Sequence, residues 1–342
     1  MAARAQPRPV TFMVDPSMYG PMYATPREVY GNLDRVVRSD LYYHYSTPIC
    51  AQRWLDVCDD PAYGHQALLD RLETTMAEVA EALRDDSGWT PRLAMCSLGP
   101  GDGSIDERML RGLDGTFELA SYTGLDSSLE LLRRSVHRMT HITGLPEDMP
   151  VHAICGDFTG LESVALPERA PDTVRLFTLT GFTLGNYPED DLLAGIEGLM
   201  AEGDYLLLDA RLHSLGPLPD DLESTPAALG GTHNGYDADT VRRFVLGPVE
   251  VATRAPVEDI PVSFELVRSI TAVPNALSLV IYCEGLDTKM RLTGQRVRRD
   301  RLDLAVTTSY HMPDLFGWLE GAGLKTVWKG SAGDVAFFLL KR

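Results

Sequence analysis

Apolar residues of this 342-residue chain occur in short blocks that end in polar, glycine-rich turns, a pattern typical of strands alternating with helices. The blocks predict five strands, at residues 93–98, 122–126, 151–158, 174–181 and 205–209. The last block is apolar at almost every position, as expected for a parallel strand that helices cover on both faces. This alternation predicts an α/β fold built on one parallel sheet.

Helical periodicity fills the segments before and between these strands. Residues 19–83 look helical, and residues 188–200 predict a helix that begins near a proline, which suits a first turn. Both segments carry apolar stripes at three- and four-residue spacing: Leu68, Leu69, Leu72, Met76, Val79, Ala80 and Leu83 in the first, and Leu192, Leu193, Ile196, Leu199 and Met200 in the second. After the fifth strand, a short helix near residues 238–246 precedes period-two alternation at residues 265–271 and 276–282, which predicts antiparallel strands.

The turn after the first strand holds glycines at three alternate positions, Gly99, Gly101 and Gly103. Without Cβ atoms, such a turn lets the backbone approach a ligand closely. The next strand ends on Asp126, whose carboxylate can accept from both hydroxyls of a ribose. Ser104 stands where a nicotinamide-binding turn has its third glycine, and no Gly-Lys-Ser/Thr follows to hold a triphosphate. The turn predicts a nucleoside without phosphates, such as S-adenosylmethionine; the alternative is an ordinary strand turn.

Two further strand ends carry candidate ligand contacts. Asp157 and Phe158 follow the third strand, where a carboxylate can accept from the adenine amine while the ring packs on the base. The fourth strand ends at Gly181 and leads to Asn186, which packing alone explains poorly. We expect Asn186 in the active site; the alternative is that it caps the helix beginning near Pro188.

Composition narrows the ligand and its setting. A formal net charge of −18 disfavours a nucleic-acid substrate, since duplex binding needs a basic surface, and leaves a small molecule as the expected substrate. Neither a signal sequence nor an apolar run of membrane-spanning length occurs, so we expect a cytoplasmic protein, monomeric or homodimeric, with no membrane partner. The scattered, odd number of cysteines without a C-x-x-C pair predicts reduced thiols and no metal site: Cys50, Cys58, Cys96, Cys155 and Cys283.

Several histidines and arginines outside these motifs have plainer interpretations. His137 and His141 lie one helical turn apart, but no acid completes a metal-binding pattern, which favours an exposed helix face. The arginines between residues 296 and 301 favour an exposed strand or hairpin over a clamp for an anionic substrate. His311 is either a substrate contact or a polar residue at a helix start.

Three segments together resemble a known family. Residues 181–188, Gly-Phe-Thr-Leu-Gly-Asn-Tyr-Pro, are similar to the Gly-Ser-Thr-Ile-Gly-Asn-Phe segment of the histidine-specific Nα-methyltransferases of the ergothioneine pathway. Residues 306–313, with the helix and strand pair that follow, match that family's carboxyl-terminal part, and residues 40–43 are similar to its Pro-Glu-Tyr-Tyr segment. The chain thus resembles a divergent member of the class I S-adenosylmethionine-dependent methyltransferases. The resemblance implies a Rossmann-like α/β sheet with an added α+β substrate-binding lobe.

The resemblance also implies roles for individual residues. The glycine turn would line the methionine and ribose of S-adenosylmethionine, and other residues would hold the ribose, contact the adenine or close over the cofactor; the implied set is Tyr42, Gly99, Gly101, Gly103, Asp126, Asp157, Phe158, Gly181 and Asn186. Asn186 and Tyr43 would be catalytic, with Asn186 beside the reacting amine. The implied contacts to the acceptor are Asn186, Thr307, Ser309 and His311.

Three positions depart from the family pattern. Ser97 stands where the family has the acid that opens the glycine motif, and Ile105 stands where it has a lysine. The family's Glu-x-Ser pair, which holds the histidine imidazole, reads Thr307-Thr308-Ser309 here. Loss of a charged acceptor removes roughly 1.5–3 kcal/mol of recognition.

We therefore expect methylation, at nitrogen, of a small amino acid or amino-acid-derived metabolite other than free histidine. The alternative is an enzyme that transfers or cyclises the aminocarboxypropyl arm of the same cofactor and releases methylthioadenosine.

The expected domain organisation has four parts. Residues 1–90 form an amino-terminal helical block that belongs to the substrate lobe, and residues 91–211 form the S-adenosylmethionine-binding core. Residues 212–306 form an inserted substrate-binding lobe. Residues 307–342 supply the carboxyl-terminal helix and strand pair that complete the core.

Overall fold

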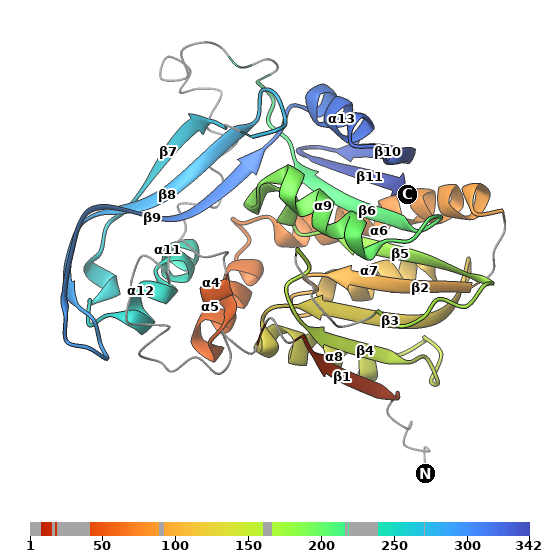
Figure 1. Cartoon of the computed structure of the whole chain (residues 1–342), viewed down its shortest axis with the longest axis horizontal. Helices are drawn as coiled ribbons and strands as arrows, with labels where there is room; N and C mark the ends of the chain where they lie inside the picture. The colour runs from red at the N-terminus through yellow and green to blue at the C-terminus, as the bar shows by residue number, and fades with distance from the viewer. Residues whose placement is uncertain are drawn as a thin grey trace.

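An eight-stranded sheet is the centre of the computed structural model. The structure describes residues 8–15, 18, 42–88, 92–159, 166–215, 218, 239–269 and 271–342. The strands lie in the order β1 (Val10–Val14), β4 (Val151–Cys155), β3 (Glu118–Asp126), β2 (Arg92–Leu98), β5 (Thr173–Leu179), β6 (Tyr205–Arg211), β11 (Val335–Lys341) and β10 (Lys325–Ala332). Neighbours from β1 to β6 pair in parallel, whereas β11 runs antiparallel to both β6 and β10 (Figure 1).

Helices cover both faces of this sheet, because alternate strand residues point to opposite sides. On one face lie α6 (His65–Asp86), α7 (Ser104–Leu113) and α8 (Leu129–His141), and on the other lie α9 (Glu189–Leu199) and α13 (Met312–Gly321). Within β2, Met95 is buried in the first core and its neighbour Cys96 in the second. The predicted stripe of residues 68–83 is wholly buried in α6. The predicted Rossmann-like α/β fold is confirmed.

A smaller, three-stranded sheet forms a second centre of packing. It consists of β7 (Val262–Arg268), β8 (Leu277–Lys289) and β9 (Arg296–Ser309), paired antiparallel in that order. It packs with α5 (Pro48–Asp59), α11 (Asp239–Val245) and α12 (Gly247–Ala252), so that Val57, Phe244 and Ile281 share one core. The predicted strands and short helix of this region are confirmed, and the arginines at 296–301 lie on β9 as predicted.

The described part of residues 1–90 contributes to both packing centres. Val57 of α5 is buried in the core of the small sheet, whereas Leu72 of α6 is buried against the large sheet. The division of the chain into four parts stays a prediction. Among the described helices, none is long and apolar enough to cross a membrane.

Candidate functional site

A cavity opens where the carboxyl ends of β2, β3 and β5 meet at one edge of the large sheet. Since β2 pairs with β3 on one side and with β5 on the other, the strand order reverses here, which is where open α/β sheets bind ligands. The cavity has an empty volume of about 900 Å³, which includes the space open to solvent at its mouth. The predicted residues that line it are Gly99, Gly101, Asp126, Phe158, Gly181 and Asn186.

The glycine turn forms part of the cavity wall. Gly99 and Gly101 both have positive φ, and a Cβ on Gly99 would lie 3.7 Å from the ring of Phe158, filling space between turn and ring. Gly103 does not line the cavity. It precedes α7 with φ 81°, and a Cβ there would lie 3.0 Å from Oγ of Ser135 on α8. Gly103 therefore allows two helices to pack closely, and its predicted contact with a ligand stays a prediction.

Asp126 ends β3 with its carboxylate beside the turn. Oδ2 accepts from the backbone N–H of Gly101 at 3.3 Å, and Oδ1 accepts from that of Ser128 at 2.7 Å. Burial raises the pKa of Asp126 to about 6, although both backbone donors act against the rise. The side chain is ionised at neutral pH, and its remaining lone pairs can accept from ligand hydroxyls.

Of the two predicted adenine contacts, Phe158 lines the cavity and Asp157 does not. The Phe158 ring meets that of Tyr187 at 5.8 Å between centroids and 60° between planes. Oδ1 of Asp157 accepts from the backbone N–H and the hydroxyl of Thr159 at 2.8 and 2.7 Å. Asp157 thus closes a local turn, because a short polar side chain next to a turn commonly bonds two residues onward.

A buried carboxylate shapes the loop after β5. The Asp209 side chain accepts from the backbone N–H groups of Gly181 and Phe182 at 2.9 and 2.8 Å, and burial raises its pKa to about 7. These bonds hold Phe182 at φ 64°, which is uncommon for a residue with a side chain. The loop leads into the short 3₁₀ helix η2 (Thr183–Asn186).

Asn186 is the last residue of η2, and it does not cap the helix that follows. The residue before α9 is Pro188, and no side chain caps that helix. The helix-cap alternative for Asn186 is therefore wrong. Its side-chain amide has no hydrogen-bond partner among the described residues, and it lines both the first cavity and an adjoining second one.

The second cavity, with an empty volume of about 530 Å³, continues from the first toward the small sheet. Both cavities are lined by Tyr45, Trp54, Tyr63, Phe182 and Asn186. These aromatic residues are absent from the predicted set. Tyr45 lies in the tyrosine-rich segment at residues 42–45 and Phe182 in the segment at residues 181–188, whereas Trp54 lies on α5 and Tyr63 follows it.

Of the predicted acceptor contacts on β9 and beyond, only Thr307 lines the second cavity. The buried Ser309 donates to the carbonyl of Leu277 at 3.4 Å. Nδ1 of His311 lies 2.6 Å from Oδ2 of Asp314 at the start of α13. His311 is a polar residue at the start of α13, and the predicted acceptor contacts of Ser309 and His311 stay predictions.

Tyr42 and Tyr43 belong to the short helix α4 (Tyr42–Tyr45), but their side chains lie outside the part of the chain that the structure describes. Their predicted roles stay predictions. Tyr45 of the same helix meets Trp54 edge-on at 5.7 Å between ring centroids.

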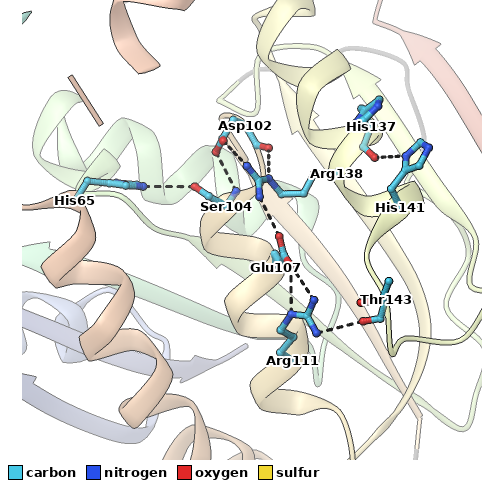
Figure 2. A network of polar contacts seen from close by, with 9 residues as sticks. All are labelled: His65, Asp102, Ser104, Glu107, Arg111, His137, Arg138, His141 and Thr143. Carbon is cyan, nitrogen blue, oxygen red and sulfur yellow. Dashed lines mark hydrogen bonds and ion pairs between the residues drawn. The ribbon is translucent and has the colours of Figure 1, made fainter. Parts of the chain in front are cut away.

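A polar network fixes the glycine turn from behind. Arg138 of α8 donates to Asp102 at 2.8 Å and to Glu107 at 3.0 Å, and Asp102 accepts from the backbone N–H of Ser104 at 2.9 Å (Figure 2). At the cavity side, Nε2 of His65 lies 3.4 Å from the Ser104 hydroxyl. Since Asp102 lies between two glycines of the turn, these bonds limit the turn's freedom.

Farther along α8, His137 and His141 stack at 4.3 Å on the exposed face, as predicted. Within the described ranges, no cluster of three or more His, Cys, Asp or Glu side chains could hold a metal ion.

No family model and no curated sequence matches the chain. Its structure is similar to that of an S-adenosylmethionine-dependent methyltransferase from Clostridium acetobutylicum, with 12% identity, 77% of this chain and 89% of that chain covered, and a TM-score of 0.40. It is also similar to human N-acetylserotonin methyltransferase in complex with S-adenosylmethionine, with 15% identity, 95% of this chain and 70% of that chain covered, and a TM-score of 0.40. The CcbJ methyltransferase from Streptomyces caelestis is similar as well, with 13% identity, 78% of this chain and 95% of that chain covered, and a TM-score of 0.37. At these identities the likeness concerns the fold alone.

Proposed function

We propose that the protein is an S-adenosylmethionine-dependent methyltransferase that acts on a small molecule. The observation that carries the proposal is the pair of adjoining cavities, one lined by the glycine turn and Asp126, the other reached past Asn186. Among the described residues, no lysine or arginine lines the first cavity, whereas Asp102 and Asp126 do. Such a lining suits a positively charged cofactor without phosphates.

Individual residues fit parts of this cofactor. Asp126 would accept from the ribose hydroxyls, and Phe158 with Tyr187 would pack on the adenine. Gly99 and Gly101 leave room for the methionine portion. We also assign Gly181 to this lining and keep Tyr42 as a closing contact.

The chain's contribution to the reaction is alignment and exclusion of water. When bound, S-adenosylmethionine would supply the methyl group for the acceptor nitrogen, with the carbon–sulfur electron pair remaining on sulfur and the acceptor proton leaving to bulk solvent as the products are released. The amide oxygen of Asn186 would accept from the acceptor N–H and thereby orient the lone pair toward the first cavity. Tyr43 is the proposed second catalytic residue. The aromatic side chains shared by both cavities exclude water.

We propose further that the acceptor is an amino-acid-derived metabolite methylated at nitrogen, and not free histidine. Thr307, which lines the second cavity, offers a hydroxyl where the resembling family offers a carboxylate to the imidazole. A site without that charge loses its strongest contact with histidine.

A product assay tests the proposal. The purified protein is incubated with methyl-labelled S-adenosylmethionine and a pool of amino acids and their derivatives, and the products are identified by mass. S-adenosylhomocysteine together with a labelled acceptor supports methyl transfer. Methylthioadenosine would instead identify transfer or cyclisation of the aminocarboxypropyl arm. Absence of both products, with no calorimetric binding of S-adenosylhomocysteine, would overturn the proposed function.

A further inference from the structure

The second cavity is walled by apolar and aromatic side chains. Five of its lining residues are aromatic, namely Tyr45, Trp54, Tyr63, Phe182 and Phe244. Aliphatic side chains from α5, α11 and the strands β8 and β9 complete the wall, and Ile281 and Ala305 lie on the face of the small sheet that packs against α5 and α11. An amide from Asn186 and a hydroxyl from Thr307 are its non-aromatic polar groups.

The aromatic rings support one another without a ligand. The Trp54 ring meets Tyr45 at 5.7 Å and 88°, and it meets Tyr63 at 5.7 Å and 80°. Its centroid lies 5.3 Å from that of Phe244. Edge-to-face contacts of this kind are a preferred arrangement of aromatic pairs, so the wall is formed before a flat molecule enters.

Charged groups near the cavity are paired with one another. Arg53 of α5 forms an ion pair with Glu250 of α12, and Arg242 and Arg243 of α11 both pair with Asp239. None of these residues lines the cavity, and no lining residue within the described ranges is charged. An acceptor carboxylate placed here would lose its hydration without gaining a charged partner in the described wall, because the Arg211 guanidinium lies over the Phe182 and Tyr63 rings and does not itself line the cavity.

A cationic acceptor is disfavoured as well, because a positive charge already lies beside the cavity. Aromatic faces can bind cations, but the Arg211 guanidinium already lies over the Phe182 ring at 4.5 Å and over the Tyr63 ring at 5.9 Å. Two of the five rings therefore already face a positive charge. A second cation inside the cavity would be repelled by the first.

We propose that the acceptor is an uncharged aromatic molecule whose ring packs against Trp54 and Phe244 and whose nucleophilic nitrogen lies at Asn186. The inference rests on the proposed methyl transfer and narrows its substrate class to metabolites that have lost or masked their amino-acid charges. The hydroxyl of Thr307 is available to a second polar group on the ring.

Calorimetry on protein saturated with S-adenosylhomocysteine tests this class directly. Indole, tryptamine and tryptophan share one ring system and are neutral, cationic and zwitterionic at pH 7.5. We expect indole to bind at least about tenfold more tightly than either charged probe, since neither charge would find a partner. Equal or tighter binding of tryptamine or tryptophan overturns the inference, as does failure of indole to bind. Failure of S-adenosylhomocysteine itself to bind would instead overturn the proposed function.

A matched pair of variants provides the control. Thr307→Glu places a carboxylate in the cavity wall, whereas Thr307→Gln adds a similar length without charge. We expect Thr307→Glu to reverse the preference, favouring tryptamine over indole, and Thr307→Gln to retain the preference for indole. An unchanged order in Thr307→Glu, or a reversal in Thr307→Gln, contradicts the inference. Binding of S-adenosylhomocysteine by both variants shows that they are folded.

Discussion

The hydroxyl of Ser97 lies 2.9 Å from Oδ1 of Asp106, so a buried carboxyl ties the start of the glycine turn to α7. The Tyr122 hydroxyl donates to the other oxygen of Asp106 at 2.5 Å, and burial raises the pKa of Asp106 to about 7. The resembling family has an acid on the strand, whereas in this chain the acid comes from the helix and the strand supplies its donor.

Replacing Ser97→Asp should destabilise the protein. The new carboxyl would replace a hydrogen-bond donor to Asp106, and we expect a loss of roughly 1–3 kcal/mol in the free energy of unfolding. The loss should be larger at pH 8 than at pH 6, because two adjacent buried carboxyls resist ionisation. Scanning calorimetry at both pH values measures it. The exchange variant Ser97→Asp with Asp106→Ser keeps one acid and one hydroxyl and should recover much of the stability. Equal melting of Ser97→Asp and the parent at pH 8 would contradict this account.

Affinity for S-adenosylhomocysteine should fall as pH drops through about 6. The Asp126 carboxylate, whose pKa is about 6, is mostly protonated at pH 5 and then no longer accepts from both ribose hydroxyls. We expect about a tenfold loss of affinity between pH 7.5 and pH 5, following the ionised fraction. The variant Asp126→Asn should bind more weakly at pH 7.5 and show a flatter pH dependence. If calorimetry finds the same pH dependence of affinity in the parent and the variant, Asp126 does not bind the ribose.

The stability of the ligand-free protein should depend on pH in the opposite direction to the affinity for S-adenosylhomocysteine. The pKa of Asp126 is raised in the folded state, so its protonated form is the stabilising one. This contribution is fully present below the unfolded pKa near 4 and is lost as pH rises through about 6. Denaturant unfolding of the parent and of Asp126→Asn across pH 4–7 isolates the contribution, which should be missing from the variant.

Asn186→Asp should separate binding from turnover. Because Asn186 does not cap α9, the change should leave the melting temperature and the affinity for S-adenosylhomocysteine nearly intact. Turnover should fall by on the order of tenfold to hundredfold, because the acceptor is no longer oriented. Melting, calorimetry and product formation are measured on one preparation. Retained turnover would show that Asn186 has no catalytic role.

Gly185→Ala should damage both stability and turnover. A Cβ at this position would lie 2.3 Å from the backbone carbonyl oxygen of Thr308, so η2 could not stay in contact with β9. Overpacking of this kind typically costs about 1–3 kcal/mol. The control is Gly198→Ala in α9, where a Cβ would meet nothing within 4 Å and a gain of roughly 0.5–1 kcal/mol is expected. Similar melting shifts in the two variants would argue against the contact.

The sheet and the cofactor edge are predictable from sequence for one physical reason. Strands buried on both faces read as apolar blocks, and the ends of parallel strands meet at one edge, so Asp126 and Asn186 are expected in one place. The edge strand β1 has no such signal. Val10 and Phe12 are 46% and 45% exposed, and among the described strands β1 pairs with β4 alone, far away in sequence.

The acceptor cavity is less predictable because it depends on contacts between distant elements. Phe244 and Trp54 meet only because α11 and α5 pack together against the small sheet. Local hydrogen bonds also turn side chains away from the positions that strand alternation predicts. Asp157 bonds to Thr159, and Ser309 bonds across to Leu277, so neither side chain reaches a cavity.

The two cavities share five lining residues, but the rest of their walls comes from different packed cores, and this arrangement bears on how such a protein can change. The glycine turn and Asp126 belong to the large sheet, while most of the acceptor wall lies on α11, β8 and β9. Side chains on those three elements can be exchanged without touching the residues assigned to the cofactor. A few substitutions on α11, β8 and β9 would therefore change the acceptor of a related protein while the methyl donor stays the same.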